Sequence, residues 1–153
     1  MSELSLVCRR VSVSARRSPA DVRARLRGLA DRIPRIAPDP YAIAMRRLGI
    51  DAPTPAEAVL RDRLVRGGYR SRGLLPDALL IATVETGVGV WVTDADQLRI
   101  EGGELVGAGL RVPLFTTPPR PSSSRVTLFG VVVPGVAAGV VEEAVWIAAD
   151  LIE

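Results

Sequence analysis

The chain has 153 residues, of which 48% are hydrophobic and 24% charged, a balance typical of one folded domain rather than of a disordered chain. It contains no His and a single Cys, Cys8, which excludes an internal disulfide, a thiolate zinc cluster and catalysis by a His base. No uninterrupted apolar run reaches about 18 residues, so we expect no signal peptide, no membrane partner and a reducing, cytoplasmic location.

All 20 basic residues are Arg, and they are unevenly distributed. Residues 1–72 hold 16 Arg and 7 acidic residues, a net charge of +9, whereas residues 73–153 hold 4 Arg and 10 acidic residues, a net charge of −6. A basic half of this strength attracts phosphate backbones and other polyanions. The same charges also suit helix faces that are simply solvated, and composition leaves both interpretations open.

The first part of the chain predicts one strand and then helices. Residues 4–15 include alternating apolar and polar side chains, as in a strand with one wet face. Ser18 and Pro19 are a helix start, with Ser18 as the N-cap, and apolar residues follow at helical spacing. Two more helices are expected, over residues 41–48 and 56–66. Gly49 ends the first of them, and a capping box of Thr54 and Glu57 begins the second.

The middle of the chain predicts a buried helix that leads into a strand. Pro76 and Asp77 start a helix whose residues 78–84 are apolar on nearly every side, which is typical of a helix packed on a sheet. A Thr-Gly pair ends this helix, and residues 88–92 are expected to form a strand. Residues 93–96 are expected to form a turn.

The last third predicts β structure and a closing helix. We expect a hairpin, an exposed loop, a strongly apolar strand and a final helix, over residues 105–115, 116–124, 126–133 and 137–152. The predicted fold is therefore α+β, a layered single domain with a central mixed sheet packed by helices. Cys8 is expected to be a buried core thiol, because the chain has no His to activate it. Trp91, in a Val-rich strand, is expected in the core.

One stretch of the chain resembles a known family, the B-three/B-four editing domain of the phenylalanyl-tRNA synthetase β subunit, in its stand-alone form. The motifs that carry the resemblance are Arg70-Ser71-Arg72, Asp77, Glu85-Thr86-Gly87, Asp94-Ala95-Asp96-Gln97-Leu98 and Gly103-Glu104-Leu105-Val106, preceded by Arg47-Leu48-Gly49-Ile50. Residues 1–153 then form one editing-like domain, with a strand and a basic helix in 1–39 and the region of resemblance in 40–153. In this chain Leu80 and Trp91 stand where the family carries an Asn and a His.

The resemblance implies a similar fold and an editing-like activity on aminoacyl-tRNA, either hydrolysis of the ester or transfer of the aminoacyl group, without a cofactor. The catalytic candidates are Glu104, Asp94 and Glu85. The candidates for the substrate pocket are Asp77, Thr86, Gly87, Gly89, Trp91 and Asp96. The candidates for contact with the nucleic acid are Arg70, Arg72 and Arg66. Backbone N–H groups of residues 86–89 are candidate oxyanion donors.

Each of these residues also has a plainer interpretation. Asp94 and Asp96 suit a capped turn, Glu104 suits a solvated hairpin tip, and the glycines suit turn geometry. The two Asp residues lack a third ligand at useful spacing, so we expect no metal site. Glu85 lies near a helix C-terminus, where an acid is unfavourable, which indicates a paired or functional side chain.

Two further functions therefore stay open. One is a catalytically silent module that binds an amino-acid-like small molecule or a partner protein. The other is a basic, homo-oligomeric interaction module. An enzyme is expected to place a poised carboxylate in a pocket beside unoccupied backbone N–H groups, whereas a binding module is expected to have none.

Overall fold

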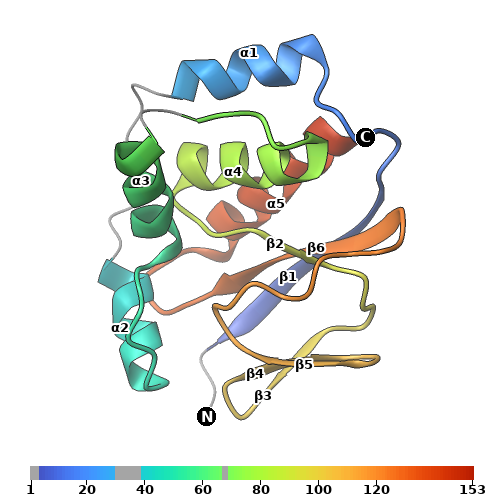
Figure 1. Ribbon diagram of the computed structural model, residues 1–153. Helices are drawn as coiled ribbons and strands as arrows, with labels where there is room; N and C mark the ends of the chain where they lie inside the picture. Colours follow the sequence, from blue (N-terminus) through green and yellow to red (C-terminus); the bar gives the residue numbers. More distant parts are fainter. Residues whose placement is uncertain (1–3, 30–38, 67–68) are drawn as a thin grey trace.

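Figure 1 shows the computed structural model, which describes residues 4–29, 39–66 and 69–153, apart from the side chains of residues 63–66. The predicted α+β class is confirmed: the described chain has five helices and two small antiparallel sheets. The sheets and helices form layers, with helices above the larger sheet and the smaller sheet below it.

The larger sheet has the strand order β1-β6-β2, and its strands are β1 Ser5–Ser12, β6 Arg125–Val132 and β2 Trp91–Thr93. Strand β6 is antiparallel to both neighbours, so the expectation of a mixed sheet is wrong. Strand β6 comes last of the three in the sequence and lies between β1 and β2, which both run in the opposite direction. Its side chains are buried along nearly the whole strand, as expected for a central strand covered on both faces.

The smaller sheet is a meander of β3 Arg99–Glu101, β4 Glu104–Gly107 and β5 Leu110–Pro113. Aromatic side chains lie between this region and the larger sheet. The Trp91 ring stacks on Phe129 at 5.9 Å and meets Phe115 edge-on at 6.1 Å, and Tyr41 meets Phe115 at 6.2 Å. Trp91 is partly buried and packs against the core, as predicted.

On the opposite face of the larger sheet α5 Ala138–Ile152 packs against β6 and β1, and α4 Leu74–Thr86 lies against α5 (Figure 1). Helix α4 is buried on most sides, as its apolar sequence predicts, and it packs against α5. Helix α5 approaches β6 so closely that a Cβ on Gly130 would lie 2.7 Å from Val141 Cγ1. The core therefore lies between these two helices and the sheet.

The remaining helices are α1 Ala20–Gly28, α2 Asp39–Arg47 and α3 Pro55–Arg66. The capping box is confirmed: Glu57 N donates to Thr54 Oγ1 and Thr54 N donates to Glu57 Oε1, both at 3.3 Å. Ser18 is not a cap, because its hydroxyl donates to the distant Asp77 instead. The sequence also predicts that Gly67-Gly68 ends α3, and this pair lies outside the described residues.

Two further expectations differ from the structure. Strand β2 is shorter than the predicted strand, because residues 88–90 are buried but do not pair with β6. In the register of the sheet Gly89 would pair with Val131. The carbonyl oxygen of Val131 instead accepts a hydrogen bond from Tyr41 Oη at 3.0 Å. Cys8 is not a buried core thiol, because it lies exposed on the edge strand β1.

Candidate functional site

Asp77, a predicted pocket residue, is a buried structural carboxylate. Its Oδ2 accepts hydrogen bonds from Ser18 Oγ at 2.5 Å and Ser71 Oγ at 2.6 Å, and its Oδ1 accepts one from Arg72 N at 2.9 Å. Only 1% of Asp77 is exposed. The carboxylate joins the start of α1, the segment before α4 and the first turn of α4, so its oxygens are occupied by the protein itself.

The turn after α4 does not offer the oxyanion donors that were expected. Gly87 N donates to Thr83 O at 2.7 Å, and Val88 N donates to Thr86 Oγ1 at 3.1 Å. Gly87 has φ +77°, the left-handed conformation in which glycine closes a helix. Since residues 86–89 are all buried, this turn is a helix cap and not an open anion site.

Glu85 lies at the same end of α4 and is paired. Arg25 of α1 donates to it through two nitrogens, Nε to Oε2 at 2.7 Å and Nη2 to Oε1 at 2.6 Å. The hydrogen bond to Glu85 raises the pKa of Arg25, and burial opposes this rise. The acid that was expected to be paired or functional is therefore paired, and it holds α1 against α4.

Gly89 and Trp91 form a packed contact rather than the wall of a cavity. A Cβ on Gly89 would lie 2.7 Å from Pro55 Cβ and 2.8 Å from Trp91 Cη2. The first residue of α3 thus touches the backbone before β2. The space that a pocket would need beside Trp91 is filled by Pro55, Phe115 and Phe129.

Asp94 follows β2 and fastens the loop before β6. Its Oδ2 accepts hydrogen bonds from Ser122 N at 2.8 Å and Ser122 Oγ at 3.2 Å, and its Oδ1 accepts one from Ser123 N at 3.1 Å. These hydrogen bonds lower the pKa of Asp94, and the bond from the Ser122 N–H has the largest effect. The charge of Arg10 lowers this pKa further. Arg10 Nη1 also donates to Asp94 O at 3.1 Å. Asp94 therefore acts as a loop clamp.

Asp96 and Glu104 lie on the side of the smaller sheet. Asp96 is exposed, accepts a hydrogen bond from Gln97 N at 2.8 Å, and borders a shallow hollow lined by Asp96, Gln97, Arg99, Gly107 and Ala108. Glu104 accepts a hydrogen bond from Arg111 Nη1 at 3.0 Å, within the sheet. Arg111 also lies 4.0 Å from Glu101, and Arg99 pairs with Glu101 at 2.7 Å, so Glu104 belongs to a surface ion network.

The three predicted catalytic carboxylates are not brought together. Glu85 belongs to α4 and Glu104 to β4, and these elements lie on opposite sides of the larger sheet (Figure 1). Asp94 is occupied by the 122–123 backbone. Arg70 is exposed, Arg72 pairs with Asp62 at 3.6 Å, and the side chain of Arg66 lies outside the described residues.

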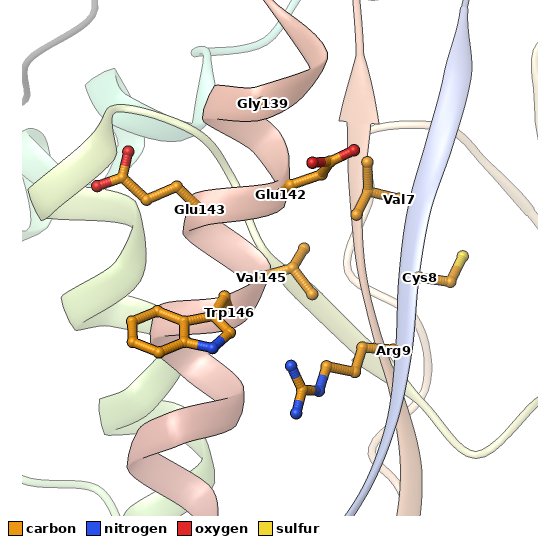
Figure 2. Close-up of a pocket in the computed structure, with 8 residues that line it drawn as sticks. All are labelled: Val7, Cys8, Arg9, Gly139, Glu142, Glu143, Val145 and Trp146. Atoms are coloured by element: carbon orange, nitrogen blue, oxygen red, sulfur yellow. The ribbon is translucent and has the colours of Figure 1, made fainter.

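The larger of the two hollows lies elsewhere, between β1 and α5, a place where no sequence motif pointed to a site. It is an open groove lined by Val7, Cys8, Arg9, Gly139, Glu142, Glu143, Val145 and Trp146 (Figure 2). Trp146 is 55% exposed, one of the two large apolar side chains on the described surface. The signal in the sequence was the position of Trp146, three or four residues from Glu142, Glu143 and Asp150 and therefore on the acidic face of α5.

The part of the chain that the structure describes contains neither a metal-ligand cluster nor a membrane-spanning helix. No three His, Cys, Asp or Glu side chains come together there as metal ligands. No described helix combines the length and apolar content of a bilayer span; α5, the longest, has 15 residues. No family model, curated protein or solved structure matches this chain.

Proposed function

We propose that this chain is a catalytically silent binding module that acts by docking a partner protein in the groove between β1 and α5. The observation that carries the proposal is the state of the predicted catalytic carboxylates. Glu85 is held by Arg25, Glu104 by Arg111, and Asp94 by the backbone of residues 122–123. A general base or a water-holding group needs an oxygen that is available to the substrate. Both oxygens of Glu85, both oxygens of Asp94 and one oxygen of Glu104 accept hydrogen bonds from the protein instead.

The groove supports a binding role on independent grounds. It combines an exposed Trp with the apolar Val7 and with charges of both signs, Arg9 and Glu142. Trp is enriched where protein surfaces bind each other, because one large side chain covers much apolar area at low cost in conformational entropy. The neighbouring strand β1 lies at the edge of its sheet, so backbone groups lie beside the same groove.

The test of catalytic silence is direct. The pure protein is incubated with a panel of charged tRNAs, and loss of the acyl group is followed with and without the protein. We expect no acceleration for any member of the panel. Acceleration by the wild type that Glu104→Gln, Asp94→Asn or Glu85→Gln abolishes would overturn the proposal, because it would assign turnover to a carboxylate that the proposal treats as structural.

The second candidate is the aminoacyl-tRNA hydrolase that the sequence resemblance implies. One observation favours it: the shallow hollow beside Asp96 lies within the region of resemblance, and the Asp96 carboxylate borders it. This candidate predicts accelerated deacylation that Asp96→Asn removes, whereas Asp150→Asn, a change at an exposed acid of α5, leaves it unchanged. The same panel therefore separates the two functions.

A further inference from the structure

Strand β1 has an unusual edge for a small domain. It spans eight residues and pairs with β6 in one continuous register, without a bulge. The other strands at sheet edges in the described chain, β2, β3 and β5, have three, three and four residues. Proteins shield long edges with Pro, bulges or outward charges, because an unpaired edge accepts another strand. β1 contains no Pro.

The charges of β1 are directed away from its open edge. Arg10 Nη1 donates to Thr127 Oγ1 at 2.9 Å and to Asp94 O at 3.1 Å, which ties this side chain across the sheet. Arg9 extends over the other face, toward Trp146 (Figure 2). Neither Arg therefore guards the edge as an outward charge would.

The backbone groups at the open edge follow from the register. Val13 N donates to Ser124 O at 2.7 Å, in the same register as the ladder. In an antiparallel pair the hydrogen-bonded residues alternate, so residues 5, 7, 9 and 11 also direct their N–H and C=O groups toward β6. The groups of Leu6, Cys8, Arg10 and Ser12 consequently point outward, where none of the described strands pairs with them.

We propose that β1 pairs with β1 of a second copy of this chain, antiparallel and centred on Cys8, so that two three-stranded sheets become one sheet of six strands. This proposal rests on the proposed function, since it names the partner that the groove binds. A two-fold axis makes an edge strand complementary to itself, because each outward N–H meets an outward C=O of the other copy.

The register follows from the charges and the strand length. A residue whose backbone groups point outward must pair with another such residue of the second copy. The two-fold axis must therefore pass through a residue that pairs with its own copy, and not between two residues. A centre at Arg9 or Arg10 places two Arg side chains directly opposite each other, which is destabilising. A centre at Val7 shortens the paired segment within Ser5–Ser12. A centre at Cys8 uses nearly the whole strand and places no Arg opposite its own copy.

This register also matches the charges of the groove. In Figure 2, Glu142 lies at the Val7 end of the groove and Arg9 lies at the Trp146 end. Centring on Cys8 places Arg9 opposite Val7 of the other copy, and so at the end where the other copy's Glu142 lies. Among the described residues, Arg9 is paired with Glu153 alone, at the long distance of 4.0 Å, so it can take a new partner. The same contact occurs twice by symmetry.

The first measurement is sedimentation equilibrium of the wild type over a range of concentrations, where we expect a reversible dimer. Cys8→Pro removes one outward N–H and no ladder bond to β6, and we expect the dissociation constant to rise by about tenfold or more. Cys8→Ser retains the N–H and is the matched control, with the dimer unchanged. Circular dichroism and thermal unfolding establish that each variant is folded.

A charge exchange tests the interface without altering the backbone. Arg9→Glu is expected to weaken the dimer, and Arg9→Glu with Glu142→Arg is expected to restore it. Because Cys8 is the only cysteine, a short bismaleimide is expected to capture two copies through Cys8, at alkaline pH where the thiolate is available.

The outcomes separate the two proposals. A wild type that stays monomeric, a dimer insensitive to both Cys8→Pro and Arg9→Glu, or a dimer without the Cys8 cross-link would overturn this pairing. Those results leave the deacylation assay untouched. Accelerated loss of the acyl group, by contrast, ends the silent binding function and does not bear on the pairing of β1. If Cys8→Pro fails to fold, the charge exchange and the cross-link decide.

Discussion

The side chain of Asp94 links two segments that the sequence places far apart. It receives two backbone N–H groups and one hydroxyl from residues 122–123, and Arg10 lies close enough to favour its charge. The loop before β6, expected to be exposed, is indeed largely exposed but is fastened at this point. At the residue scale the carboxylates of this chain thus hold structure together.

Asp94→Asn is expected to lower the free energy of unfolding near neutral pH, because an amide is a weaker acceptor for these N–H groups. The pKa of Asp94 is lowered in the folded state. Its contribution is therefore complete above the unfolded pKa of about 3.9 and is lost as the pH falls through the lower folded value. Urea unfolding of both proteins from pH 7 to pH 2 measures this; a difference that stays constant over the range would contradict the clamp.

Tyr41→Phe is expected to destabilise the protein by about 1–3 kcal/mol, because the buried Val131 carbonyl loses its hydrogen bond. Burial raises the pKa of Tyr41. The contribution of the neutral phenol is then complete below the unfolded pKa of about 10 and declines as the pH rises above it. Unfolding curves at pH 7 and at alkaline pH test this, and the gap between wild type and variant is expected to narrow at the higher pH.

At the scale of elements, α4 is anchored at both ends by polar contacts to α1 and to the segment before it. Asp77 binds Ser18 and Ser71 at the N-terminal end, and Glu85 binds Arg25 at the C-terminal end. A helix that is apolar on most sides has no strong preference for one rotation about its axis. These contacts select one orientation of α4 against α1.

Asp77→Ala is expected to cost roughly 3 kcal/mol or more, because three hydrogen bonds to one buried carboxylate are lost together. Ser71→Ala, which removes one partner from an exposed residue, is expected to cost about 1 kcal/mol and serves as the control. Thermal unfolding with calorimetry measures both. Equal costs for the two variants would contradict a central role for Asp77.

Gly89→Ala is expected to cost about 1–3 kcal/mol through overpacking, because the added methyl group meets Pro55 and Trp91 below 3 Å. Gly28→Ala, at a helical site where nothing lies within 4 Å of the new Cβ, is the control and is expected to be neutral or slightly stabilising. Guanidinium unfolding compares them; a neutral Gly89→Ala would mean that α3 can move away from β2.

Many of the helix and strand boundaries could be predicted from the sequence, because they depend on interactions between residues that are close in the chain. The Thr54–Glu57 capping box, the Gly87 helix end and the apolar β6 depend on neighbours within a few residues, so their patterns are visible in the chain. Ser18 had the same local signal for a cap, yet its partner lies 59 residues away. The sequence around Ser18 does not show that a distant carboxylate competes with the helix N-terminus for its hydroxyl group.

At the scale of the whole molecule, the candidate site could be predicted less well than the fold. The motifs correctly placed Glu85 and Asp94 at the ends of elements, but the groups that donate hydrogen bonds to them come from α1 and from the loop before β6. Similarly, the groove between β1 and α5 joins the two ends of the chain, Val7 and Trp146 among its residues. Such sites exist only after the layers have packed.

The asymmetry of charge gives a prediction at this scale. If the basic half binds tRNA, Arg70→Ala is expected to weaken binding and to reduce the slope of log affinity against log salt by about 0.7–0.9, the value of one phosphate contact. Arg70 is exposed, whereas Arg72 is already paired with Asp62, so Arg70 is the cleaner site. Filter binding at several salt concentrations measures this, with Arg120→Ala as the control.

If the slope of log affinity against log salt is unchanged in Arg70→Ala, the Arg residues of the basic half belong to solvated helix faces and do not contact phosphate. A slope equally reduced in Arg120→Ala would indicate diffuse attraction by the net charge rather than a contact at Arg70.

The position of β6 between β1 and β2 has a consequence for how the protein acquires its shape. Ser5 pairs with Val132 and Trp91 pairs with Phe129, so both neighbours are synthesised before the strand that unites them. Contacts between such distant parts of a chain require the closure of long loops, which slows folding. During synthesis β1 therefore stays without its partner strand until residues 125–132 have left the ribosome, and in that interval a chaperone or a neighbouring nascent chain has access to it.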